Sequence, residues 1–326
     1  MLKIQRVDHL ARRLDIPKSI LERVASSSDS FIRELLLTPA EPDAKTRIVV
    51  CVCGHLRLIQ RRLHDRVLLG SAQPSAFSHG GVRGRHIKSN AAPHTASEHV
   101  LTMDISNFYP SIHFRRVYKF FNVNAQCSPD VSRLLTKLTT YKHHLALGLI
   151  TSPTIANLIL NPLDVRLAKA CANAGLHYTR YVDDITVSGA YNLDPTKAGI
   201  EGFLTSILVK QGFKVSGHKT KYGRLSEGAT ITNLRVRHGR VDVSRKFLDD
   251  LQKIFADVAK VVSGHQVCDT YYSREQIRGK CQFAAWINPE RQNAIFANYR
   301  RVPWRKYERN CLALNLVKLR PSLSRA

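Results

Sequence analysis

The sequence contains no long uninterrupted apolar run. At the N-terminus, where a signal peptide would lie, charged residues interrupt every apolar stretch of MLKIQRVDHLARRLDIP. A signal peptide needs an apolar core of about 7–15 residues and a membrane-spanning helix needs about 20, so neither is predicted. We therefore expect a cytoplasmic protein with no membrane partner.

Metal-binding cysteine and histidine patterns are also missing. The seven cysteines include Cys51 and Cys53, but no two pairs occur at zinc-knuckle spacing, and an odd count suits reduced thiols. The 14 histidines include the neighbours His143 and His144, which lack the spacing of a zinc-protease motif. These absences argue against a disulfide scaffold and against the common zinc motifs.

Acidic residues are scarce. Fifty Lys and Arg against twenty-five Asp and Glu leave a formal net charge of +25. Such a surface gains free energy by releasing the counterions of a phosphate backbone, which favours a polyanionic partner. The alternative is a basic protein whose charge only keeps it soluble. Charge alone does not choose between DNA, RNA and a membrane surface.

The 326 residues, 44% of them hydrophobic, are enough for a sizeable core. Apolar spacing predicts short helices between residues 4 and 37, a strand over 46–52, an amphipathic helix ending near residue 68, and then the Gly- and Arg-rich loop SHGGVRGRHIKSN. Further along, we expect strands at 100–105, 178–182, 185–189, 213–216, 230–236 and 240–243, and helices at 111–121, 130–141, 153–170 and 196–211. After Ser244 the pattern is helical. This mixed order predicts an α+β fold, with an antiparallel sheet packed by helices on one face.

Two adjacent aspartates stand between apolar stretches. Asp183 and Asp184 follow HYTRYV and precede ITVSG, so we expect them at the tip of a β-hairpin. Like charges repel, and a simple turn would prefer Asn-Gly or Asp-Gly, so a counter-charge is implied, although an isolated Asp-Asp pair also occurs in solvated turns. Asp104 ends the strand stretch Val100-Leu101-Thr102-Met103, and pairing beside the hairpin would gather three carboxylates at one sheet edge. Such a site suits two Mg²⁺ ions roughly 4 Å apart, with Mn²⁺ as a substitute.

Four sequence blocks occur in the order found in reverse transcriptases. They are LTMDISNFYPSI, which resembles the first metal-binding strand of that superfamily, LGLITSPTIANLILNPLD, YVDD, and the lysine-bearing GFKVSGHKT. The segment SNAAPH, with Asn90, Ala91 and His94, resembles an element characteristic of the bacterial retron reverse transcriptases, whose pattern covers about residues 8 to 310. The resemblance implies catalysis and metal binding by Asp104, Asp183 and Asp184.

The resemblance implies a right-hand polymerase of α+β class. Its expected parts are N-terminal helices over 1–40, fingers over 41–98, a palm over 99–243 that contains a fingers-like helical insert at about 111–150, and a helical, basic, RNA-binding thumb over 244–326.

Four further residues are candidates for nucleotide binding. The resemblance places Arg47 against the triphosphate and Tyr109 under the incoming sugar as a steric gate, although Tyr109 could also be a core residue. Gly148 would let the backbone approach the nascent base pair. Lys219 could neutralise or protonate the leaving pyrophosphate, and its alternative is a solvated lysine.

The candidates for RNA or template contact lie in two regions. Arg83 and Arg85 resemble a fingers block that steadies template or nucleotide, and the resemblance does not distinguish between them; Asn90 and His94 belong to the retron-like element. In the C-terminal part, basic residues lie beside aromatic ones that could stack on bases or pack a core, and we expect RNA contacts from Arg300, Arg301 and Arg305.

The resemblance implies an RNA-directed DNA polymerase that uses dNTPs. For a retron enzyme, one structured non-coding RNA would serve as template and primer. Synthesis would start from a 2′-hydroxyl and leave branched RNA-linked single-stranded DNA (msDNA), used in anti-phage defence with a separate effector protein. The alternatives are another bacterial defence reverse transcriptase, a group II intron-like enzyme, or a non-catalytic RNA-binding scaffold.

The chain departs from the family pattern at two positions. Leu147 stands where many members carry Gln before the glycine, so a side-chain hydrogen bond near the nucleotide is absent. Asn233 replaces the Gly of the Val-Thr-Gly segment found in many retron enzymes, which bears on the subgroup and leaves the superfamily resemblance intact.

Overall fold

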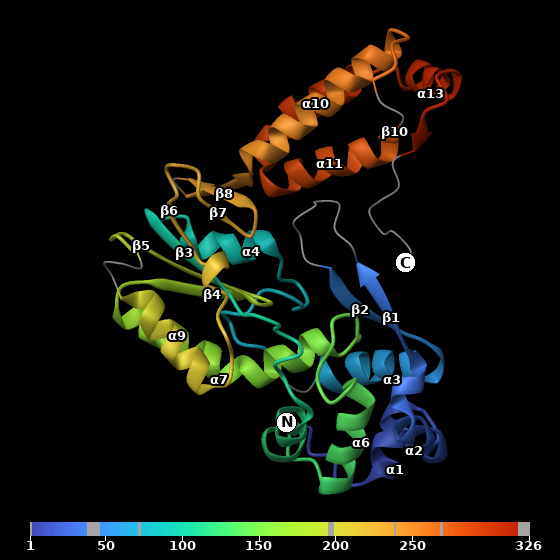
Figure 1. The fold of residues 1–326 in the computed structure, drawn as a ribbon, viewed down its shortest axis with the longest axis vertical. Coiled ribbons are helices and arrows are strands. Elements are labelled where there is room, and N and C mark those ends of the chain that lie inside the picture. Colours follow the sequence, from blue (N-terminus) through green and yellow to red (C-terminus); the bar gives the residue numbers. More distant parts are fainter. Residues whose placement is uncertain are drawn as a thin grey trace. The chain divides into compact units, whose positions relative to one another are not determined.

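The computed structural model describes residues 2–37, 46–70, 73–194, 199–237, 239–267 and 270–318. The predicted boundary at residue 40 and the chain after residue 318 lie outside the described residues. Within them the chain forms two compact units (Figure 1). The first comprises residues 2–90 and 99–222, and the second comprises 91–98 and 223–318.

Helices with a three-to-four-residue apolar spacing form one end of the first unit. They are α1 (Val7–Leu14), α2 (Lys18–Ser26), α3 (Gly54–Leu63) and α6 (Pro129–Thr139), and α3 continues into a π-helical turn, His64–Leu68. These four helices pack against one another and bury Leu10, Leu21 and Leu56 completely. The predicted N-terminal helices are confirmed up to residue 26.

The prediction of helix up to residue 37 was wrong. Strand β1 (Ile32–Leu37) pairs antiparallel with β2 (Arg47–Val52) along its whole length. The sequence IRELLL has good helix formers, so local propensity favours a helix. Non-local pairing with the β-branched strand β2 overrides that preference, as tertiary context commonly does.

A four-stranded sheet in the order β4-β5-β3-β6 belongs to the first unit, except for the last two residues of β6, which are assigned to the second. Its strands are β4 (His177–Tyr181), β5 (Asp184–Gly189), β3 (His99–Asp104) and β6 (Lys221–Arg224). Strand β5 is antiparallel to both β4 and β3. Helices α7 (Ser152–Asn173) and α9 (Ile200–Lys210) run below these strands in Figure 1. The predicted α+β class is confirmed.

One further strand prediction in this unit was wrong, whereas the helix expected at 111–121 is confirmed with shifted bounds. The expected strand at 213–216 is reduced to a single bridge between Ile105 and Val215, and the strand actually formed is β6. The loop after residue 77 contains a short helix, α4 (Ile87–Ala91), and the expected helix at 111–121 is α5 (Phe114–Lys119) followed by a π-helical turn, Phe120–Asn124.

Among its described residues, the second unit combines a small sheet with four α-helices. Its elements are β7 (Thr230–Ile231), β8 (Leu234–Arg237) and β9 (Arg240–Val243), then α10 (Arg245–Val262), α11 (Arg274–Ile287), α12 (Gln292–Arg301) and α13 (Trp304–Ala313), with β10 (Thr270–Tyr271) parallel to β11 (Val317–Lys318). Side chains cap two helices: Ser244 accepts from Phe247 N, and Ser273 with Gln276 forms a capping box. The helical pattern predicted after residue 244 is confirmed.

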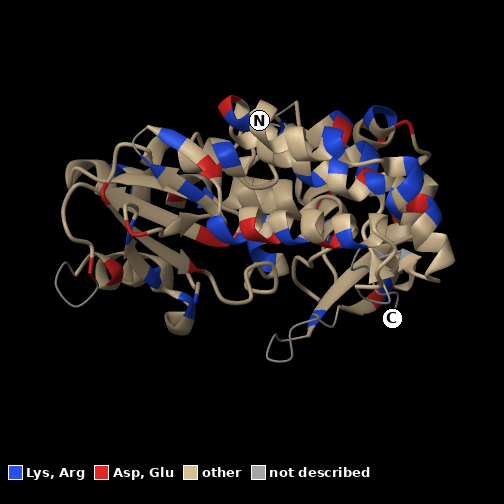
Figure 2. Cartoon of the chain, turned by 90° about the horizontal axis from the view of Figure 1, so that it is seen from above, with Lys and Arg blue, Asp and Glu red and all other residues tan. Residues whose placement is uncertain are grey.

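Charge is distributed over the elements of the chain. Figure 2 shows Lys and Arg on many helices and strands, with fewer Asp and Glu between them. Among the described residues, no helix is both long enough and apolar enough to cross a bilayer.

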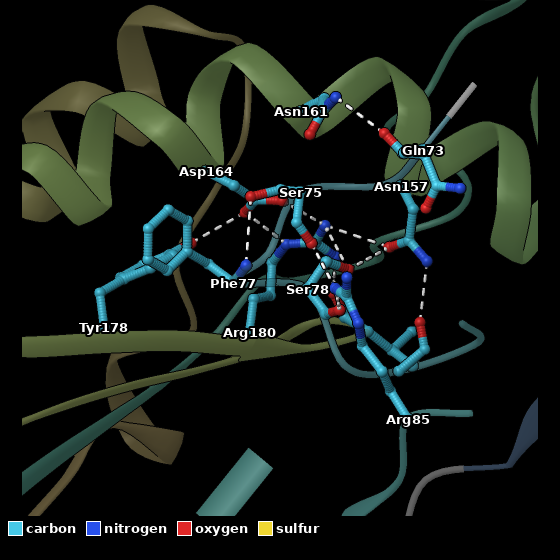
Figure 3. A network of polar contacts seen from close by, with 12 residues as sticks. Gln73, Ser75, Phe77, Ser78, Arg85, Asn157, Asn161, Asp164, Tyr178 and Arg180 are labelled. Atoms are coloured by element: carbon cyan, nitrogen blue, oxygen red, sulfur yellow. Dashed lines mark hydrogen bonds and ion pairs between the residues drawn. The ribbon is translucent and has the colours of Figure 1, made fainter. Parts of the chain in front are cut away.

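A buried ion pair joins β4 to α7. The guanidinium of Arg180 binds the carboxylate of Asp164 in a bidentate manner, with Nε–Oδ1 and Nη2–Oδ2 distances of 2.8 and 2.7 Å (Figure 3). Both side chains are almost completely buried. Tyr178, which is two residues before Arg180 and therefore on the same face of the strand, donates its hydroxyl to the same carboxylate at 3.0 Å. The carboxylate thus holds two side chains of β4.

The ion pair extends into a network of neutral groups. Arg180 Nη2 also donates to Asn157 Oδ1 on α7 at 3.1 Å and to the hydroxyl of Ser78 at 3.2 Å. Asn157 in turn donates to the carbonyl of Gly80 at 2.8 Å. The main chain of Arg180 pairs with the same loop, because its N–H donates to Phe77 O and its carbonyl accepts from His79 N, both at 2.8 Å. The loop, the strand and the helix are therefore fixed to one another.

We predict that Asp164→Asn lowers the free energy of unfolding by about 3–5 kcal/mol, because it leaves the charge of Arg180 buried without a counter-ion. Chemical denaturation checks this. Glu22→Gln, which removes a carboxylate from an exposed ion pair with Lys18 on α2, is the matched control and should leave the unfolding midpoint unchanged. Equal midpoints for the two variants would contradict the proposed importance of the buried pair.

Candidate active site

The adjacent aspartates lie at the tip of a tight hairpin, as predicted. Tyr181 and Asp184 are register partners, so the connecting loop contains only Val182 and Asp183. Val182 has a φ of +60°, an uncommon conformation for a β-branched residue. The guanidinium of Arg180 donates to the Val182 carbonyl at 2.6 Å and stabilises this turn. The buried ion pair therefore reaches the loop that carries the acidic residues.

The three predicted carboxylates come together at one end of the sheet. Strands β3 and β5 are paired so that Asp104 and Asp184 are register partners. The carbonyl of Asp183 accepts a hydrogen bond from the N–H of Ile105 at 2.9 Å, which joins the hairpin tip to the end of β3. The convergence predicted from the end of one strand and the tip of the hairpin is confirmed.

The electrostatics of this end are unfavourable for three negative charges. Burial, followed by the charges of Asp183 and Asp104, raises the pKa of Asp184 to about 7. Burial also raises the pKa of Asp183, with a further increase from Asp104 and opposing effects from Lys219 and Arg47. The site consequently favours a bound cation.

Lys219 supplies one positive charge to this site. Its Nζ lies 3.2 Å from each carboxylate oxygen of Asp104. Its side chain remains 45% exposed, which leaves it free to turn toward a ligand in solvent. The sequence left open whether Lys219 is a site residue or a solvated lysine, and the structure places it at the carboxylates.

The donor chemistry of the site fits a hard divalent cation, because carboxylate oxygens are the ligands that such ions prefer. Within the described ranges, however, no group of three or more Asp, Glu, His or Cys side chains is arranged to enclose a metal ion. Asp104 is instead directed to Lys219. The three carboxylates therefore fit a metal site in donor type and in charge, and Lys219 contacts one of them, Asp104.

Tyr109 is packed beside the acidic residues. Only 9% of the residue is exposed, and its ring meets that of Phe108 edge to face at a centroid distance of 5.2 Å. Burial, and then the charge of Asp183, raises the pKa of Tyr109 to about 12. The side chain thus has the burial of a core residue and also lies close enough to Asp183 to be affected by its charge.

Gly148 has a structural reason to be glycine. Its φ is +109°, and a Cβ placed there would lie 1.9 Å from the carbonyl oxygen of Val50 on β2. The N–H of Val50 donates to the carbonyl of Leu147 at 2.8 Å. The backbone that closely approaches Gly148 is therefore that of β2, which begins with the exposed Arg47. We had expected Gly148 to make room for a nascent base pair instead. Leu147 itself is 40% exposed.

Three of the residues predicted to contact RNA or template have surroundings within the protein itself. The guanidinium of Arg85 donates to the carbonyls of Ser75 and Ser78, so it is committed to the loop itself. Asn90 and His94 are fully buried and expose no surface to a ligand. Arg83 is exposed and remains available, which distinguishes it from Arg85.

Arg300 and Arg301 lie in the last turn of α12 and Arg305 in the first turn of α13, and all three are exposed. Among the neighbouring aromatics, Trp304 and Tyr307 are buried, which confirms a core role for part of the set, while Trp286 is 44% exposed.

The contribution of Arg180 and Asp164 was not predicted. The strand HYTRY alternates, which places Tyr178 and Arg180 on one face, and Asp164 interrupts the apolar face of α7. The position of Asp164 on an otherwise apolar helix face could have indicated a buried ion pair, since a buried charge requires a partner.

Comparison with known proteins agrees with this geometry. A family model described as reverse transcriptase (RNA-dependent DNA polymerase) matches residues 39–255. The chain is similar to the retron Ec86 reverse transcriptase of Escherichia coli, being 28% identical over 271 residues that cover 83% of this chain and 81% of the relative. It is also similar to the retron Se72 reverse transcriptase of Salmonella heidelberg (28% identical, 72% of this chain and 62% of the relative) and to the retron Mx65 reverse transcriptase of Myxococcus xanthus (29% identical, 74% and 58%).

These matches confirm the predicted resemblance to retron reverse transcriptases and the predicted enzyme class. Reverse transcriptases generally use divalent metal ions, RNA templates and dNTPs. Together with the match over residues 39–255, the carboxylates at the hairpin tip lead to one conclusion: the chain belongs to the reverse transcriptase family of RNA-dependent DNA polymerases.

Proposed function

We propose that this reverse transcriptase copies part of one structured non-coding RNA and leaves msDNA, a single-stranded DNA branched from a 2′-hydroxyl of that RNA. The observation that carries the proposal is the convergence of Asp104, Asp183 and Asp184 at one end of the sheet. Similarity to several retron enzymes supports the choice of RNA-linked product. The biological role we propose is anti-phage defence in the cytoplasm, together with a separate effector protein.

The chain would be organised as a right hand. We assign fingers to residues 41–98, a palm to 99–243 and a thumb to 244–326. The three carboxylates then lie in the palm, Arg47 begins a fingers strand, and the exposed Arg300, Arg301 and Arg305 belong to the thumb.

Asp104, Asp183 and Asp184 would hold two Mg²⁺ ions. When bound, the ions would lower the charge repulsion at the site, activate a primer hydroxyl and stabilise the leaving pyrophosphate. Lys219 would leave Asp104 and turn to the triphosphate, where its charge would balance that of the leaving group. Arg47 would bind the same triphosphate through its planar guanidinium.

Tyr109 would select the sugar. Its ring is held by Phe108 and by the surrounding core, so it cannot easily move aside for a larger substrate. A 2′-hydroxyl on the incoming nucleotide would collide with a wall of this kind, whereas a deoxyribose would not. The burial that first suggested a core residue is therefore compatible with a gate.

We predict that Asp183→Asn and Asp104→Asn each lower dNTP incorporation by more than about a hundredfold. Loss of a residue that only positions a metal ligand typically costs about 10–100-fold, and loss of the ligand itself should cost more. Neither variant should lose thermal stability, because each relieves carboxylate repulsion. Primer extension on an annealed RNA template measures the rate. Asp65→Asn changes an exposed aspartate in the first unit and should retain wild-type extension. Activity of either site variant within a few-fold of the wild type would refute the metal-ligand assignment.

We predict that Tyr109→Ala and Tyr109→Val admit ribonucleotides, because the wall below the sugar is removed. Tyr109→Phe keeps the ring and should keep the wild-type preference, which separates the role of the ring from that of the hydroxyl. Single-nucleotide incorporation with matched dNTP and rNTP measures the preference. An unchanged ratio in the Ala and Val variants would place Tyr109 outside the nucleotide site.

We predict that replacement of Arg300, Arg301 and Arg305 by Glu weakens binding of the RNA that co-purifies with the protein. The slope of log affinity against log salt should become shallower by about one unit per lost phosphate contact. Extension of a generic annealed primer–template should suffer less, because the palm carboxylates are unchanged. Equal losses on both substrates, or a wild-type slope, would exclude these arginines as specific RNA contacts.

A further inference from the structure

The second unit contains a cavity of about 710 Å³. Strands β8 and β9, the first two turns of α10 and the chain between α11 and α12 form its walls. Its size is within the range of about 300–1,000 Å³ that is usual for ligand sites. Five of its lining residues are arginines: Arg235, Arg237, Arg240, Arg245 and Arg291.

Regular secondary structure explains why the arginines gather here. Along β8, Leu234 and Val236 are buried, so Arg235 and Arg237 project from the opposite face of the strand. The register of the β8–β9 pair places Arg240 opposite Arg237. The cavity is thus built on rigid elements.

Three of the arginines are already balanced by carboxylates. Arg291 lies 3.1 Å from Asp242, Arg240 lies 2.7 Å from Glu290, and Arg245 lies 4.0 Å from Asp249. All three carboxylates also line the cavity, so they occupy three of the five cations and neutralise their charge locally.

Arg235 and Arg237 are different. Neither has a carboxylate within ion-pair distance in the part of the chain that the structure describes. Arg237 donates one hydrogen bond to the carbonyl of Ser226 at 3.2 Å, while the buried Nε of Arg235 has no hydrogen-bond acceptor among the described residues. A buried donor left without an acceptor is costly.

The surroundings of Arg235 are short of negative charge. Burial, followed by the charges of Arg237 and Arg245, lowers the pKa of its guanidinium, and Asp242 opposes this only in part. An anion that entered the cavity would supply the missing negative charge.

We propose that Arg235 and Arg237 bind a phosphate group of the RNA backbone in this cavity. The ligand class follows from the donors, because a planar guanidinium matches two phosphate oxygens at once. Since the site is concave, it receives a phosphate that projects from a sharply turned strand, whereas the regular backbone of a duplex would pass across its mouth. The choice of RNA, rather than an acidic segment of a protein, rests on the proposed function.

The test uses the full-length protein and the RNA extracted from the purified wild type. The double variant Arg235→Gln with Arg237→Gln should weaken binding of this RNA by about tenfold or more, given the strength of hydrogen bonds to charged groups, and should make the salt slope shallower by about one to two units. The matched control is Lys253→Gln with Lys260→Gln, which removes the same charge from exposed positions of α10 outside the cavity and should bind like the wild type.

A second variant separates charge from geometry. Arg235→Lys with Arg237→Lys keeps both charges and loses the planar forks, so the salt slope should stay near the wild-type value while affinity falls. Thermal melting of each variant checks that the second unit remains folded. Extension of a generic annealed primer–template should be unchanged in all of them, so loss of the polymerase activity itself would be recognised separately.

Three results would overturn the proposal. The first is wild-type RNA affinity in the Gln variant with its fold intact. The second is an equal loss in the Gln variant and in the α10 control, which would indicate only a general effect of charge. The third is that poly-glutamate displaces the bound RNA as effectively as unlabelled RNA does, and that neither competitor displaces RNA from the Gln variant. This result would assign the cavity to an acidic protein segment.

Discussion

The buried charge of Arg180 is the constraint on which the rest of the first unit depends. A guanidinium removed from water is tolerated only where a carboxylate and further acceptors surround it, and here Asp164, Asn157, Ser78 and the Val182 carbonyl meet that need. These partners come from a helix, a loop and the hairpin turn. All three elements must therefore stay in position if the buried guanidinium is to keep its hydrogen bonds. The hairpin tip is held as a consequence.

The position of the tip sets the chemistry of the site. Register pairing brings Asp104 beside Asp184, and the carbonyl of Asp183 accepts a hydrogen bond from Ile105, the residue that follows β3. Burial, followed by repulsion from Asp183 and Asp104, raises the pKa of Asp184 to about 7. Such a site is costly unless a cation occupies it, and in this structure Lys219 supplies one. A rigid support, acidic residues and a partly exposed lysine together make an arrangement suited to nucleotidyl transfer.

The site was more predictable from the sequence than its support. Alternation around Asp183 and Asp184 predicted the hairpin, and the strand ending at Asp104 predicted their convergence. Residues whose surroundings are non-local were missed: β1 is a strand only because β2 pairs with it, and Gly148 is required by the approach of Val50. The motif that suggested RNA contact at Asn90 and His94 gave no sign that both side chains are buried. Local sequence patterns do not predict contacts between residues that are far apart in the chain.

The proposed function requires that DNA synthesis at Asp104, Asp183 and Asp184 start from one particular RNA and leave the DNA joined to it. Sequencing the nucleic acid that co-purifies with the wild type and with Asp183→Asn tests it most directly. We expect the same structured RNA in both samples, with DNA attached through a 2′-hydroxyl only in the wild type. Unlinked DNA, a spliced intron RNA, or identical RNA without DNA in both samples would contradict it.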